Sequence, residues 1–265
     1  MKKHSLIGLL IVVVIIIQSC STIPIIGRRQ LNLLPESQLV AMSLTSYQEF
    51  LDTNNVVTSG QYYQMVQNSG KKIAASVEQF MKDNGMNDRL TNFKWEFNLV
   101  NDPTPNAWAM PGGKIVFYEG IMPLCQNEDG VAVVMGHEIA HAVARHGNER
   151  MSHGLLTQLG GIALDVAIRE QPEKTRNIFL SAYGLGSQVG VMLPYSRKHE
   201  YEADRLGLIF LTMAGYNPEE SIRFWERMSA HGGADMPEFL STHPVSKNRV
   251  EALKKLLPEM EQYKP

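Results

Sequence analysis

The sequence is poor in cysteine, in any excess of one charge sign and in long apolar runs, and each shortage excludes a class of protein. Two cysteines among 265 residues exclude a disulfide framework and a cysteine-rich zinc knuckle. Lys and Arg number 25 against 27 acidic residues, so no nucleic-acid partner is expected. The N-terminal apolar run, Leu6 to Ile17, falls short of the roughly 20 residues that a membrane span needs. The chain is nevertheless 44% hydrophobic, which permits a sizeable core.

The first residues look like an export signal. Lys2 and Lys3 precede the apolar run, and the run ends in Ser19-Cys20. This stretch resembles a bacterial lipoprotein signal, in which the chain is cut before a cysteine that then carries lipid. We therefore expect lipidation of Cys20 and attachment to the membrane through that lipid. An uncleaved N-terminal anchor is the alternative.

Three segments follow from this interpretation. Residues 1–19 are expected to be the lipoprotein signal peptide, residues 20–35 a lipid-anchored tether, and residues 36–265 one metallopeptidase domain. The expected location is the bacterial cell envelope, facing the periplasm. Ser21, directly after the lipid cysteine, favours the outer membrane.

The spacing of apolar residues predicts a mostly helical α+β domain. Helical periodicity covers residues 36–52 and 61–83 and then nearly everything after residue 128. Between them, residues 93–99 alternate as a half-buried strand does, and Pro111-Gly112-Gly113 predicts a tight turn between two further strands. We expect a small antiparallel sheet beside the long helices.

The most informative motif is His137-Glu138-Ile139-Ala140-His141. On a helix, residues i and i+4 lie on one face, so both imidazoles can reach one metal ion. Glu138 lies one step round the helix and can meet a water on that metal as a general base. Gly136 permits close approach of another element.

A catalytic zinc needs a third protein ligand and an open position for water. His146 is rotated about 140° from His141 on a helix and is a poor candidate. Glu200 and Asp204 lie four residues apart on one later helical face. We assign Glu200 as the third ligand of one Zn²⁺ per chain, and Asp204 as the acceptor of the other N–H of His137. The open fourth position argues against a purely structural zinc.

These motifs together resemble the zinc metalloendopeptidase family of the type I CAAX prenyl proteases and the HtpX-like and Oma-like proteases. The likeness is greatest to its bacterial periplasmic lipoprotein members, such as LoiP and the protease part of BepA. It spans roughly residues 24–255, and four further stretches carry it: Gly27–Leu31, Asn106–Gly113, Pro194–Arg197, and Ser241–Pro244 with Arg249.

The resemblance implies a gluzincin-type fold, zinc and endopeptidase activity. It implies that His243 donates to the oxyanion of the reaction or, as in some relatives, caps the zinc and keeps the enzyme latent. It gives Arg249 a supporting role, pinning that loop or contacting Glu200. It also implies that Asn106, Ala107, Trp108 and Ala109 form an edge strand on which an extended substrate pairs; a core position for Trp108 is the alternative.

The predicted function is that of a zinc-dependent endopeptidase that cleaves unfolded, misfolded or misassembled envelope proteins. The alternative is a chaperone-like or assembly factor that holds clients with the same fold while proteolysis is latent. The apolar segment Leu155–Ile168, with Gly160-Gly161 inside it, is either a packed helix or a mobile lid or contact surface for unfolded chains or membrane. The oligomeric state is left open.

Overall fold

The computed structural model describes residues 20–23, 26–231, 238–244 and 246–265. The chain forms two compact units. The first contains the residues up to Glu36 and Arg145–His199, and the second contains Ser37–Ala144 and Glu200–Pro265. The predicted signal peptide, residues 1–19, lies outside the described residues.

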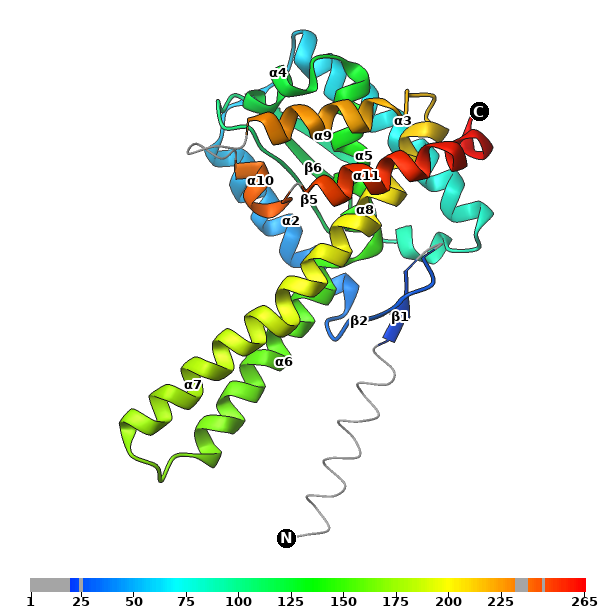
Figure 1. Ribbon diagram of the computed structural model, residues 1–265. Coiled ribbons are helices and arrows are strands. Elements are labelled where there is room, and N and C mark those ends of the chain that lie inside the picture. Colours follow the sequence, from blue (N-terminus) through cyan, green and yellow to red (C-terminus); the bar gives the residue numbers. More distant parts are fainter. Residues whose placement is uncertain (1–19, 24–25, 232–237, 245) are drawn as a thin grey trace. The chain divides into compact units, whose positions relative to one another are not determined.

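A four-stranded sheet lies in the second unit (Figure 1). Its strands are β3 (Val56–Val57), β4 (Glu96–Val100), β5 (Ala107–Met110) and β6 (Lys114–Tyr118), in the order β3-β4-β6-β5. The β5–β6 hairpin turns at Gly112 and Gly113, whose φ angles of 89° and 82° suit glycine. The turn returns β6 between β4 and β5, so β5 is an edge strand of the described sheet.

This topology corrects one expectation. The sheet is mixed and not antiparallel, because β4 and β6 are parallel while the other neighbours are antiparallel. The loop after β4 carries the chain past the position of β6 to the sheet edge before the hairpin turns back. The predicted α+β class with mostly helical content is confirmed.

Helices of the second unit pack against the sheet and one another. α2 (Glu36–Thr53), α3 (Gln61–Asp83) and α5 (Glu128–Ala144) contribute buried apolar residues to its core. The second unit also contains η1 (Asn87–Leu90), η2 (Glu119–Ile121), α4 (Met122–Cys125), α9 (Glu220–Ala230), α10 (Glu238–Thr242), α11 (Lys247–Leu256) and η4 (Leu257–Tyr263).

α5 and α8 (Leu193–Met213) cross with their backbones in contact. A Cβ atom placed on Gly136 would lie 2.9 Å from the carbonyl oxygen of Gly207, and one on Gly207 would lie 2.9 Å from the backbone nitrogen of His137. The close approach predicted at Gly136 is therefore present, and its partner is α8. The crossing places the two sequence motifs for metal binding next to each other.

The first unit contains a short strand pair and a helical hairpin. β1 (Cys20–Thr22) pairs antiparallel with β2 (Arg29–Leu31), and β2 packs on α6 (His146–Ala167). α7 (Glu173–Ser187) returns beside α6 and continues through one π-helical turn, η3 (Gln188–Met192), into α8 (Figure 1). Arg145, with a φ of 60°, breaks the helix between α5 and α6. The predicted tether and domain boundaries stay predictions.

No helix among the described residues combines the length and apolarity required to traverse a bilayer.

A buried ion cluster holds the base of the first unit together. Glu149, 1% exposed, accepts two hydrogen bonds of 2.7 Å from Arg28 and lies 2.8 Å from His199 Nε2. His199 stacks on His146, with ring centroids 4.3 Å apart. Burial alone would raise the pKa of Glu149, but the hydrogen bonds from Arg28 and His199 outweigh it and lower the pKa to about 2.

We therefore predict a pH-dependent cost for Glu149→Gln. Because the pKa of the folded state lies below the ordinary 4.5, the ionised carboxylate stabilises the fold above about pH 5, and this contribution disappears as the pH falls towards about 2. At neutral pH the variant should lose about 2–3 kcal/mol of unfolding free energy. Urea unfolding at several pH values measures it, with the exposed Glu170→Gln as control. A difference that is constant with pH would contradict this assignment.

Candidate metal centre

Four side chains, three from two helices and one from the residue that follows a third helix, converge in the second unit. They are His137 and His141 from α5, Glu200 from α8 and His243 directly after α10, and their possible ligand atoms all lie within 4.8 Å of one another. The Nε2 atoms of His137 and His141 are 3.1 Å apart. Glu200 places Oε2 3.3 Å from the first of these nitrogens and Oε1 3.4 Å from the second. The structure thus brings together the three ligands proposed from the sequence.

These separations fit a tetrahedral zinc site. Zinc bonds of 2.0–2.1 Å in a tetrahedron place neighbouring donor atoms about 3.3–3.4 Å apart. The charges fit as well, because the buried carboxylates of Glu200 and Asp204 share one guanidinium, that of Arg249. A divalent cation would balance the remaining negative charge. The ligand set and its geometry therefore suit Zn²⁺.

His243 lies at the fourth corner of this group. Its Nδ1 is 3.2 Å from His137 Nε2 and 3.2 Å from Glu200 Oε2, while its Nε2 is 3.2 Å from Glu138 Oε1. The sequence predicted an open position for water here, with His243 either donating to the oxyanion or capping the zinc. In this structure the position is filled, and the imidazole has the capping placement.

The charged groups behind the ligands form one connected set. His137 Nδ1 lies 3.1 Å from Asp204 Oδ1, so the two residues paired from the sequence are in ion-pair contact, while the hydrogen bond from His137 to Asp204 stays a prediction. Arg249 donates to both oxygens of Asp204, at 2.8 and 2.7 Å, lies 3.0 Å from Glu200 Oε2, and donates to the carbonyl of Pro244. Both contacts considered for Arg249 are therefore present, one to the loop beside His243 and one to Glu200.

The pKa values follow from these contacts. Burial opposes ionisation of Asp204 and of Glu200, yet the pKa of each is lowered, by Arg249 for Asp204 and by His141 and His137 for Glu200. Burial also opposes a charge on His137, but Asp204 and Glu200 raise its pKa to about 9. A metal ion bound at Nε2 would compete with a proton for His137.

Two aromatic residues of the site were missed from the sequence. Trp225 on α9 lies under His137, with ring centroids 5.2 Å apart, and Arg249 stacks on its face at 4.3 Å. Phe239 stacks on Trp225 and contacts His243 at 4.6 Å. Neither Trp225 nor Phe239 stands in a metal-binding motif of the sequence, so only the fold could reveal that these rings fix ligand positions.

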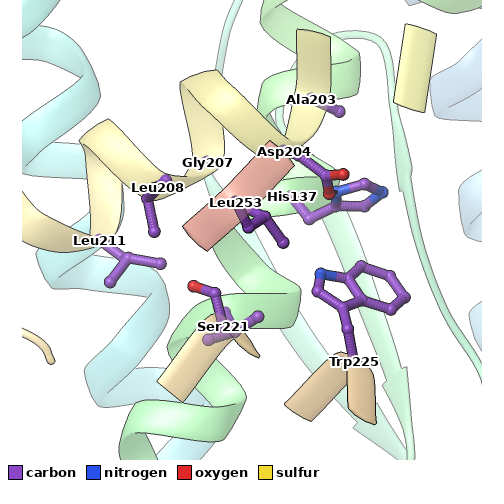
Figure 2. A pocket seen from close by; sticks show the side chains of 10 residues that line it. His137, Ala203, Asp204, Gly207, Leu208, Leu211, Ser221, Trp225 and Leu253 are labelled. Carbon is purple, nitrogen blue, oxygen red and sulfur yellow. Dashed lines mark ion pairs between the residues drawn. The ribbon is translucent and has the colours of Figure 1, made fainter. Parts of the chain in front are cut away.

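Figure 2 shows the residues that line a small pocket next to His137. Asp204 reaches the imidazole of His137 from α8, and Trp225 lies across from them. A cavity of about 10 Å³ lies here and is also lined by Gly207 and Ser221. The imidazole of His137 is thus held in place by the carboxylate of Asp204 and the indole of Trp225.

Glu138 is buried beside the ligands, and its carboxyl lies against the imidazole of His243. Its burial raises the pKa of the carboxyl, while the neighbouring His243 and His137 lower it less strongly. A hydrogen bond from the backbone N–H of Ala109 also reaches it. A carboxyl with a raised pKa next to a metal position is suited to accept and return a proton near neutral pH.

The proposed substrate strand lies beside Glu138. Ala109 presents its N–H to Glu138, and the N–H of Ala107 bonds to the side-chain oxygen of Asn106 at 2.9 Å. The carbonyl of Pro105 accepts a bond from Phe239 at the start of α10. Trp108 instead packs on Phe50 at 5.0 Å and lies, partly buried, against an apolar cluster that contains Tyr47, so its ring covers the core and does not line the metal site.

Comparison with known proteins gives concordant results. A model of peptidase family M48 matches residues 67–257. The mitochondrial metalloendopeptidase OMA1 of Saccharomyces cerevisiae is 40% identical over 192 residues, which are 69% of this chain and 53% of that protein. The human mitochondrial metalloendopeptidase OMA1 is 32% identical over 247 residues, 89% of this chain and 45% of that protein.

The beta-barrel assembly-enhancing protease of Escherichia coli O157:H7 is 28% identical over 162 residues, 59% of this chain and 33% of that protein. The chain spans about half, or less, of the length of these relatives. The predicted enzyme class, a zinc metalloendopeptidase, is confirmed at the level of the family.

These relatives overturn the predicted location. We expected a lipoprotein of the bacterial cell envelope, facing the periplasm at the outer membrane. Instead, the relatives from two yeasts, a plant and human are mitochondrial metalloendopeptidases. The expectation rested on a short N-terminal pattern around Cys20, which says little about the body of the chain. Lipidation of Cys20 itself stays a prediction.

The match over residues 67–257 agrees with the donor group found independently in the structure. The chain belongs to peptidase family M48.

Proposed function

We propose that the chain is a zinc-dependent endopeptidase whose reaction is carried by Glu138 beside the His137, His141 and Glu200 ligand set. The observation that carries the proposal is the tetrahedral spacing of the donor atoms, 3.1–3.4 Å, with a buried carboxyl next to them. Zinc bound there supplies a Lewis acid and shifts the pKa of water towards neutrality.

Residues of the chain then supply the proton transfer, the positioning of the ligands and the binding of substrate. Glu138 takes a proton from the attacking water and returns it to the leaving amine, for which its raised pKa suits it. Asp204 and Arg249 hold His137 and Glu200 in place. The backbone of β5 beside Glu138 aligns an extended polypeptide, giving affinity with little sequence selectivity. We propose unfolded or misfolded polypeptides as substrates for this reason.

We further propose that the structure represents a latent form. His243 lies between Glu138 and the ligand atoms, where the attacking water and the substrate carbonyl must be. Phe239 holds this segment through its stacking on Trp225 and its bond to Pro105. Movement of α10 away from β5 would open the position and free the strand edge for substrate.

One test of the proposed reaction is Glu138→Gln in the full chain. Because the amide cannot carry the proton, we expect cleavage of casein to fall by about 10³-fold or more, while bound zinc stays near one per chain. Fluorogenic casein and metal analysis measure both, and a chelator should abolish cleavage by the unaltered chain. Equal cleavage by both chains would contradict the assignment of the base. Client holding without any cleavage would favour the chaperone-like alternative.

A second test concerns His243→Ala. If the imidazole blocks the reaction centre, removing it should raise the rate of casein cleavage by about tenfold at unchanged protein stability. His231→Ala, at the exposed C-terminal end of α9, is the matched control and should leave the rate unaltered. A large fall in rate for His243→Ala would instead assign His243 to the oxyanion and reject latency.

A further inference from the structure

The α6–α7 hairpin of the first unit exposes an unusual amount of apolar side chain. Among its described residues between His153 and Lys198, none is buried. Several large apolar side chains are more than half exposed, among them Leu159, Ile162, Val166, Ile178, Phe179, Leu185 and Val189. Isolated helices without a covered apolar face are marginally stable in water. Something outside the described residues must cover them.

These side chains point outwards on both helices. α6 meets α7 where the Tyr183 hydroxyl donates to the carbonyl of Thr157 and where a Cβ on Gly160 would touch the same hydroxyl. Each residue turns a helix by about 100°, so residues two positions further on lie on the opposite side. On α6, Leu159 and Ile162 come two positions after the contact residues Thr157 and Gly160. On α7, Leu185 comes two positions after Tyr183. The hairpin therefore has one apolar outer flank on α6 and another on α7.

Charge is missing from both flanks. Residues 151–164 and 177–196 contain no Asp, Glu, Lys or Arg. The charged residues lie together around the turn, three acidic and three basic: Asp165, Arg169, Glu170, Glu173, Lys174 and Arg176. Interfaces between proteins normally carry a rim of polar and charged residues, and the charged part of such a rim is absent from both ranges. Two apolar flanks on opposite sides of one hairpin suit a fluid apolar medium better than a single protein surface.

The position of the N-terminal segment indicates what that medium is. The apolar run Leu6 to Ile17 leads directly into β1, which begins at Cys20. β1 pairs with β2, and β2 packs on α6. Cys20, which follows this run by three residues, therefore lies in the same unit as the hairpin and is joined through β1 and β2 to α6. A bilayer that takes up the run would lie within reach of the hairpin.

We propose that the α6–α7 hairpin lies in the interfacial layer of a lipid bilayer, with lipid against both outer flanks. The hairpin does not cross the bilayer, and the charged turn and Arg150 reach the headgroups. Because the charges at the turn sum to zero, the attraction comes from apolar area. Contact with lipid therefore requires no anionic headgroup and resists salt.

The test places single tryptophans in the full chain. Val166→Trp probes the α6 flank, Leu185→Trp probes the α7 flank, and Met42→Trp on α2 is the control. Met42 is as exposed as Val166, at 59%. Each chain is mixed with phosphatidylcholine vesicles carrying bromine on the acyl chains. Fluorescence is corrected for the native tryptophans, all of which lie in the second unit, by subtracting the unaltered chain.

We expect the emission of the tryptophan on each flank to fall about twofold, at low salt and in about 1 M NaCl, and that of Met42→Trp to stay constant. Absence of quenching on the flanks, or equal quenching at all three positions, overturns the proposal. A blue shift that depends on protein concentration and not on lipid also overturns it, since a second copy of the chain would then cover the flanks.

Discussion

The backbone contact between α5 and α8 at Gly136 and Gly207 is the constraint on which the site depends. A side chain on either glycine would meet the backbone of the other helix at 2.9 Å, so the two helices would have to separate. His137 directly follows Gly136, and Asp204 lies one turn before Gly207. The same contact therefore sets the spacing between the imidazoles of one helix and the carboxylates of the other.

A second requirement is the balance of buried charge. Glu200 and Asp204 are 3% and 5% exposed and would be costly to bury without a cation. Arg249 contacts both, and its guanidinium stacks on Trp225. Arg249 also donates a hydrogen bond to the carbonyl of Pro244, next to His243. The group that stabilises the ligands therefore also holds the segment that closes the site.

Much of the site was predictable because local spacing determines it. Two histidines four residues apart on a helix share a face in any fold, and the same argument pairs Glu200 with Asp204. The placement of His243 and Trp225 depends on how α9 and α10 pack, which no periodicity records. The parallel pairing of β4 with β6 likewise depends on the path of a loop. The location inferred from the residues around Cys20 was wrong, because a short N-terminal pattern carries little information about the rest of the chain.

His243 completes the donor group with His137, His141 and Glu200. Zinc X-ray absorption of the full chain measures this, because imidazole rings give a characteristic outer-shell signal. Four nitrogen or oxygen ligands at about 2.0–2.1 Å are expected, with three imidazoles in the unaltered chain and two in His243→Ala. Two imidazoles in both chains would show that His243 does not bind the metal.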